Sequence, residues 1–214
     1  MAVLDRIAHF QGRRDEVPNQ ELARDLAARR DEPGIREIAE NLWSKDKNVR
    51  ADCLKVLYEI GYIDPALVVP YADDFIRLLK SSNNRLVWGA MIALGTIAHL
   101  KADVVFSHLS EIQKTMAAGS VITVDNGVQT LALAASAGGQ YNQAIFPYLL
   151  QHLKTCRPKE VAQHAEKTLP AVNAANKADF IAVLQKRQID LSGSALTRVK
   201  KVIKTADSRS SFDD

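Results

Sequence analysis

A pattern of apolar and small residues recurs four times along this chain and limits its fold more than any other feature. In each copy, an apolar residue at position n is followed by apolar or small residues at n+4, n+7, n+8 and n+11. The copies start at Val49, Leu86, Val128 and Val161, so successive starts lie 37, 42 and 33 residues apart. A period of roughly 20 to 50 residues is typical of repeat proteins. We therefore expect an array of similar structural units.

The spacing within each copy predicts an α-helix with one buried face. At about 100° per residue, the five positions fall within an arc of roughly 100°. Small side chains at n+4 and n+7 allow neighbouring helices to pack closely. The residues three positions before the four starts are Asp46, Asn83, Asp125 and Pro158. Because such residues cap a helix or occupy its first turn, each helix is expected to begin there.

Further helical patterns lie before and between the copies. They predict three helices near the N-terminus and four partner helices, over residues 2–10, 20–30, 33–44, 65–80, 103–116, 142–154 and 177–187. The segment 119–124 is rich in β-branched residues and is expected to be an extended loop. With the four repeated helices and a last one over 194–204, about twelve helices joined by short loops are expected.

The repeated template resembles HEAT repeats of the armadillo type, including the short bacterial kind. The second copy reads LVWGAMIALGTI, and Asp46, Val49 and Arg50 match the capping, apolar and arginine positions of that family. Pro70 and Pro147 resemble the proline of a repeat's first helix. The arginine position holds other residues in the later copies, namely Val87, Gln129 and Ala162.

This resemblance covers residues 33–187 and implies an all-α fold, a right-handed α-α superhelix or solenoid built from HEAT-like helix hairpins. It also implies a curved scaffold that binds proteins or nucleic acids. We expect an N-terminal helical cap at 1–32, the repeat array at 33–190, a basic capping helix at 191–205 and a disordered tail at 206–214.

The composition indicates a soluble protein of the cytoplasm. Hydrophobic residues make up 47% and charged residues 25% of the chain, which is the balance of a globular protein. We expect no membrane association, because no stretch approaches the roughly 18 to 20 consecutive apolar residues of a spanning helix. Two cysteines are too few to indicate a disulfide framework. The protein is expected to be a monomer or a weak dimer.

No catalytic pattern stands out, so the sequence predicts neither an enzyme nor a metal or cofactor site. The five histidines lack the i, i+4 spacing with an adjacent glutamate that marks a helical zinc protease. No glycine-rich loop follows a strand, which excludes the common nucleotide cradles. Cys53 occupies a small core position and is expected to be structural, and Cys156 stands alone within a helical pattern.

The leading hypothesis is a non-enzymatic scaffold that binds an unidentified protein partner through the solenoid groove. Offsets n+2, n+6 and n+13 lie on the side of each helix away from the core. The proposed groove residues on that side are Lys55, Tyr62, Trp88, His99, Tyr141 and Lys167. Aromatic rings at such positions are favoured in interfaces. The alternative, that these rings close each hairpin and Trp88 packs on its partner helix, stays open.

The second hypothesis is nucleic-acid binding by the basic C-terminal third. Residues 151–204 hold eleven Lys or Arg and four Asp or Glu, a balance of +7. The candidate phosphate contacts are Lys154, Arg157, Lys159, Lys167, Lys186, Arg187, Arg198, Lys200, Lys201 and Lys204. A less favoured variant is an alkyl-base DNA glycosylase, a chemistry found in a few bacterial HEAT-like proteins, with Asp52 as its carboxylate. A solvated surface and a terminal capping helix explain the same charges without any ligand.

Overall fold

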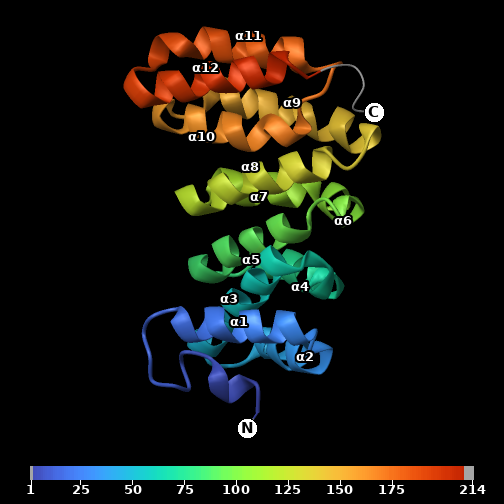
Figure 1. The fold of residues 1–214 in the computed structure, drawn as a ribbon, viewed down its shortest axis with the longest axis vertical. Helices are drawn as coiled ribbons and strands as arrows, with labels where there is room; N and C mark the ends of the chain where they lie inside the picture. The colour runs from blue at the N-terminus through green and yellow to red at the C-terminus, as the bar shows by residue number, and fades with distance from the viewer. Residues whose placement is uncertain (1, 210–214) are drawn as a thin grey trace. The chain divides into compact units, whose positions relative to one another are not determined.

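The computed structural model describes residues 2–209, and these residues fold entirely into helices and connecting turns (Figure 1). The described part contains twelve α-helices and six short 3-10 helices, with no strand among them. The predicted all-α class is therefore confirmed. None of the helices in this part is long and apolar enough to cross a membrane.

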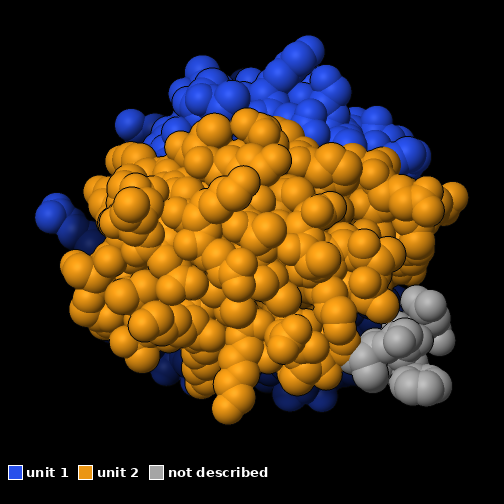
Figure 2. Space-filling view, turned by 90° about the horizontal axis from the view of Figure 1, so that it is seen from above, with its two compact units in different colours: residues 1–127 blue, residues 128–214 orange. Residues whose placement is uncertain are grey.

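The chain divides into two compact units, residues 1–127 and 128–214, which are coloured separately in Figure 2. The boundary falls within helix α8 (Val121–Ala135). The helices that lie wholly in unit 1 are α1 (Val17–Arg29), α2 (Glu32–Glu40), α3 (Lys47–Ile63), α4 (Ala72–Leu78), α5 (Asn84–Ile97), α6 (Ala102–Ser107) and α7 (Leu109–Ala118).

In unit 1, helix α3 packs between α1 and α5, while α2 lies against α3 and α4 lies against α5. All five template positions of the first two copies are buried. Asp46 accepts a hydrogen bond from the backbone N–H of Asn48 at 2.7 Å, and Asn83 accepts one from Arg85 at 2.9 Å. The predicted starts of α3 and α5 are therefore confirmed, with the expected capping residues.

The predicted start of the third repeated helix, at Asp125, is wrong. Helix α8 begins at Val121, and Asp125 lies inside it rather than before it. The hydroxyl of Ser120 accepts from the backbone N–H of Thr123 at 3.3 Å and so provides the cap. The expected loop over 119–124 is consequently helical from Val121 onward, because local capping and packing outweigh the weak β preference of branched residues.

The partner helices of unit 1 are shorter than predicted. The segment 65–80 forms two 3-10 turns, Pro65–Leu67 and Val69–Tyr71, before α4 begins. Pro70 lies in the second turn and cannot donate a backbone hydrogen bond, which disfavours one continuous helix. The segment 103–116 is broken at His108 into α6 and α7. The segment 2–10 contains only the 3-10 helix Leu4–Arg6.

Beyond α8, unit 2 contains α9 (Gly139–Thr155), α10 (Pro158–Thr168), α11 (Lys177–Arg187) and α12 (Gly193–Asp207). Helix α9 packs against α10 and α11, and α12 packs against both α10 and α11. Ala206 is buried within α12, so the expected disorder from residue 206 is wrong at the start of that segment. Residues 210–214 lie outside the described part.

Candidate functional site

The candidate binding surface of unit 1 is formed by Lys55 and Tyr62 of α3 together with Trp88 and His99 at α5. We call it the α3–α5 face. Lys55 and Trp88 line one shallow depression with Tyr58, so the structure brings these two predicted residues together. Tyr62 is 62% exposed at the end of α3, and His99 is exposed just after α5 ends.

Lys55 is not presented to solvent as a free cation. Its side chain is only 9% exposed, and its ammonium lies 2.8 Å from Glu16 and 2.7 Å from Glu59. Burial by itself would lower the pKa of Lys55, but the hydrogen bonds to both carboxylates outweigh burial and raise it. This lysine therefore joins the segment before α1 to α3.

The aromatic side chains of this face are held by close helix packing. Trp88 is half-buried, and the next residue, Gly89, approaches α3 so closely that a Cβ atom there would lie 2.8 Å from Leu54 Cδ2. The rings of Tyr58 and Tyr62 meet edge to face, with centroids 6.1 Å apart. Rings fixed in this way lose little conformational entropy when a partner binds.

The two remaining groove candidates, Tyr141 and Lys167, lie in unit 2. Tyr141 is half-buried in the first turn of α9, and Lys167 is half-buried near the end of α10. The groove hypothesis that joins them to the α3–α5 face stays a prediction.

Apart from the half-buried Lys167, the candidate phosphate contacts in unit 2 fall into two groups. The three arginines with carboxylate partners are Arg157 with Glu160, Arg187 with Asp190, and Arg198 with Glu166. The exposed lysines are Lys154, Lys159, Lys186, Lys200, Lys201 and Lys204. Only the lysines therefore offer charge that these carboxylates do not already neutralise.

Asp52, the carboxylate considered for base chemistry, and its neighbour Cys53 both have structural roles. Asp52 is buried and accepts a hydrogen bond from the backbone N–H of His9 at 2.8 Å, which ties the N-terminal segment to α3. Cys53 is fully buried, as expected, and burial raises the pKa of its thiol to about 12. A thiol with such a pKa stays protonated at neutral pH and is a poor nucleophile.

A cleft of about 740 Å³ lies in unit 1 between the α4–α5 turn and helix α7. Its lining combines apolar side chains, such as Leu79 and Val87, with polar ones, such as Ser110 and Lys114. Glu111 pairs with Lys80 at 3.3 Å through one carboxylate oxygen, while its other oxygen, Oε1, is buried without a hydrogen-bond partner. No sequence motif marks this cleft, because its lining comes from two turns and one helix face.

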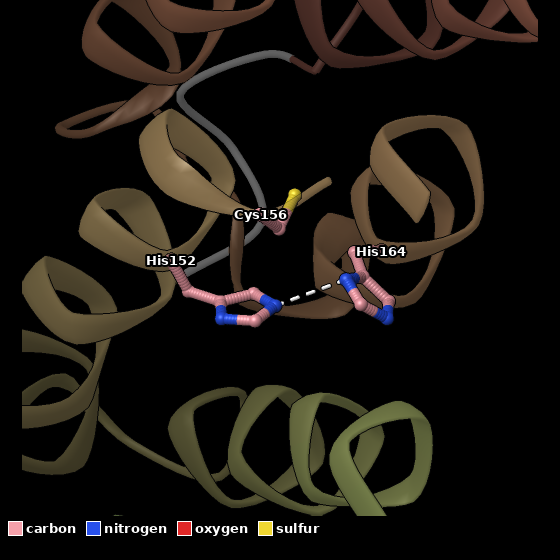
Figure 3. Close-up of side chains that lie close together, drawn as sticks. All are labelled: His152, Cys156 and His164. Carbon is pink, nitrogen blue, oxygen red and sulfur yellow. Dashed lines mark hydrogen bonds between the residues drawn. The ribbon is translucent and has the colours of Figure 1, made fainter. Parts of the chain in front are cut away.

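In unit 2, the structure brings together His152, Cys156 and His164, a cluster that was not predicted from the sequence (Figure 3). Nε2 of His152 lies 2.9 Å from Nδ1 of His164, and the ligand atoms of the three residues all lie within 4.8 Å of one another. His152 and Cys156 are four residues apart at the end of α9. That spacing, together with a histidine in the middle of the next helix, was the signal available in the sequence.

No family model matches this sequence, and no curated protein matches it. Solved structures do match. A designed armadillo repeat protein in complex with the peptide (KR)4 aligns with a TM-score of 0.68 and 13% identity, covering 87% of this chain and 86% of that one. Two engineered proteins, each 18% identical, align over 97% of this chain with TM-scores of 0.65 and 0.64, covering 98% and 100% of their own chains.

The fold is an armadillo-type helical repeat. Armadillo-type repeats stack helices so that each unit contacts its neighbours, and they commonly bind peptides or proteins on the surface of the stack. At 13% to 18% identity, the likeness shows the fold alone. Function therefore has to be argued from the side chains of this chain.

Proposed function

We propose that this protein is a non-enzymatic binding module that takes up a segment of another protein on the α3–α5 face. The observation that carries the proposal is a row of aromatic side chains on two packed helices: half-buried Trp88 lines a shallow depression with Tyr58, and the ring of Tyr58 meets that of the exposed Tyr62. Aromatic side chains that are held rigidly and partly exposed account for much of the binding energy in protein interfaces.

The charges on this face favour a partner segment with apolar side chains. Glu16 and Glu59 are already paired with Lys55, and Glu16 also lies 3.5 Å from Arg85. The designed relative is in complex with the strongly basic peptide (KR)4. Here the carboxylates have their own cationic partners, so a basic peptide would have to displace them. We expect an affinity that depends only weakly on salt.

The proposal is tested by selecting peptides from a random display library against the full-length protein and measuring their affinity for variants. We expect Tyr62→Ala and Trp88→Ala each to weaken binding by roughly tenfold or more, as losses of interface aromatics do. Trp43→Ala is the matched control. Trp43 is 44% exposed, but it lies after α2 and its ring faces the guanidinium of Arg77.

Equal affinities for all variants, each confirmed to be folded by circular dichroism, would contradict the proposed face. The natural partner would be sought by capture from a nuclease-treated lysate at moderate salt. We expect the protein to act as a monomer or weak dimer in a reducing cytoplasm, a setting supported by two free cysteines.

A second candidate function is binding to a nucleic-acid backbone by unit 2. Helix α12 buries Val199 and Val202, while Lys200, Lys201 and Lys204 project from its exposed side. In a plot of the logarithm of the binding constant for duplex DNA against the logarithm of the salt concentration, each neutralised phosphate steepens the slope by about 0.9. Replacing the three lysines by Gln should then reduce that slope by roughly 3. Failure of the wild-type protein to bind duplex DNA or RNA at low salt would exclude this function.

A further inference from the structure

The antiparallel hairpin of α9 and α10 places three metal-binding side chains at one point. His152 lies in the last turn of α9, Cys156 directly follows that helix, and His164 lies in α10. The backbone N–H of Cys156 donates to the carbonyl of His152 at 2.8 Å, so these two residues share one helical turn. In Figure 3 the two imidazoles point toward each other, and Cys156 lies near them with its sulfur directed away from the rings in this view.

We propose that His152, Cys156 and His164 bind a zinc ion. Two imidazole nitrogens and one thiolate form a ligand set that zinc favours in proteins. Three protein ligands leave the fourth tetrahedral position for a water molecule, and His152 is half-buried, so that solvent can reach the site. This inference is independent of the proposed peptide-binding function, because all three residues lie in unit 2.

The observed distances are close to those of a zinc site. With Zn–N of about 2.05 Å and Zn–S of about 2.3 Å, tetrahedral geometry puts two nitrogens about 3.3 Å apart and nitrogen and sulfur about 3.5 Å apart. The two nitrogens now lie 2.9 Å apart, and all the ligand atoms lie within 4.8 Å of one another. Completing the site therefore requires a rotation of the Cys156 side chain that brings Sγ closer to the two nitrogens, together with a slight separation of the two rings.

The present contact of the sulfur allows this adjustment. Sγ of Cys156 makes a long hydrogen bond of 3.8 Å to the carbonyl of Leu153, and the guanidinium of Arg187 also interacts with this thiol. That carbonyl also accepts from Nη1 of Arg187 at 2.7 Å, so it keeps a strong donor when the sulfur turns away. Rotation about the Cα–Cβ bond of Cys156 thus leaves no polar group without a partner in this contact.

The surroundings hold the backbone of the site in place. Arg187 of α11 donates to the carbonyls of both Leu153 and Cys156, at 2.7 and 2.8 Å, and so fixes the end of α9. Its own charge is balanced by Asp190 at 2.7 Å. Supporting contacts of this kind, beyond the ligands themselves, orient metal sites in proteins. The backbone that carries Cys156 is therefore held in place by hydrogen bonds from α11.

Zinc binding at this site releases one proton, from the thiol of Cys156. When zinc binds, the Sγ–H bond of Cys156 breaks, its electron pair forms the Zn–S bond, and the proton passes to solvent. Zinc also replaces the hydrogen between Nε2 of His152 and Nδ1 of His164. The imidazole that carries this hydrogen shifts it to its other ring nitrogen through solvent, so both rings stay neutral and each offers a lone pair. No oxidation or reduction is involved.

The test uses the full-length protein, stripped with a chelator and titrated with Co²⁺, which gives visible absorption in a tetrahedral site and a near-ultraviolet band when bound to thiolate. We expect one equivalent of Co²⁺ to bind and excess Zn²⁺ to displace it. C156S should abolish the near-ultraviolet band, and H152Q should weaken Co²⁺ binding by at least about tenfold. C53A is the matched control and should bind as the wild type does, because Cys53 is fully buried.

A second measurement keeps the proposal testable if a variant is poorly folded. Zn²⁺ should raise the Tm of the wild-type protein and of C53A, since a ligand that binds only the folded state stabilises it. It should leave the Tm of C156S unchanged. The zinc site is overturned if wild-type protein gives no tetrahedral Co²⁺ spectrum, or if C156S and H152Q bind Co²⁺ as tightly as wild type.

Discussion

Gly61 of α3 faces Thr96 of α5 so closely that a Cβ atom on the glycine would lie 2.8 Å from Cβ of the threonine. Real side chains do not approach to this distance, and the threonine is attached to a helix backbone that cannot easily move. The packing of α3 against α5, and with it the α3–α5 face, therefore requires a residue without a side chain at position 61.

Replacing Gly61 by Ala should lower the free energy of unfolding by about 1–3 kcal/mol, because the added methyl group overpacks the α3–α5 contact. Urea denaturation would measure the loss. In the double variant with Thr96→Ala, two of the three nearest atoms are removed, so part of the stability should return. Simple additivity of the two changes would argue against direct contact.

Lys55→Met should destabilise unit 1 by about 1–3 kcal/mol, because Glu16 and Glu59 lose the buried ammonium that pairs with them. Lys80→Met is the matched control, since Lys80 is 69% exposed although it also pairs with a glutamate. Its effect should stay within about 0.5 kcal/mol. If thermal denaturation showed equal losses of stability for the two variants, burial of Lys55 would add nothing to the strength of its ion pairs.

Asn142→Asp should destabilise unit 2 by about 1–3 kcal/mol. The side-chain amide of Asn142 donates to the carbonyl of Ala171 at 2.8 Å, and its oxygen accepts from Asn176 at 2.9 Å. A carboxylate cannot make the first of these bonds. Hydrogen exchange should quicken in α9 and α11, whereas Gln143→Glu, at the exposed neighbouring position, should leave it unchanged. If the two variants showed the same hydrogen-exchange rates in α9 and α11, this role of Asn142 would be contradicted.

Acid should weaken the contact between α10 and α12. Hydrogen bonds from Arg198 to Glu166, at 2.8 and 2.6 Å, hold the pKa of Glu166 below its ordinary value of 4.5. The pair therefore stabilises the fold above pH 4.5, and this contribution is lost as the pH falls through the lower pKa of the folded state.

The size of this acid effect should be at most about 1 kcal/mol, because both side chains are about half exposed. Denaturation midpoints measured between pH 6 and pH 3 should fall less steeply for Glu166→Gln than for wild type. Glu21→Gln, on the exposed side of α1, is the control and should follow the wild-type slope. Identical slopes for all three proteins would show that this pair carries no pH dependence.

Local patterns in the sequence determined the helices and the core. Template residues such as Val49 and Leu86 are buried because the 3.6-residue period of a helix places them on one face wherever that helix packs. Asp46 and Asn83 could be identified as caps because capping involves only the next few residues. The start of α8 was misplaced because Ser120 and Asp125 are both suitable capping residues. Which of them caps the helix depends on how the folded chain packs.

Contacts between residues far apart in the chain were decided only by the tertiary structure. Lys55 pairs with Glu16, and His152 meets His164 from the neighbouring helix. Periodicity shows which face of a helix is buried, but not which side chain of another helix lies opposite. That depends on the relative rotation and separation of packed helices, which are fixed by how all their side chains interlock at once.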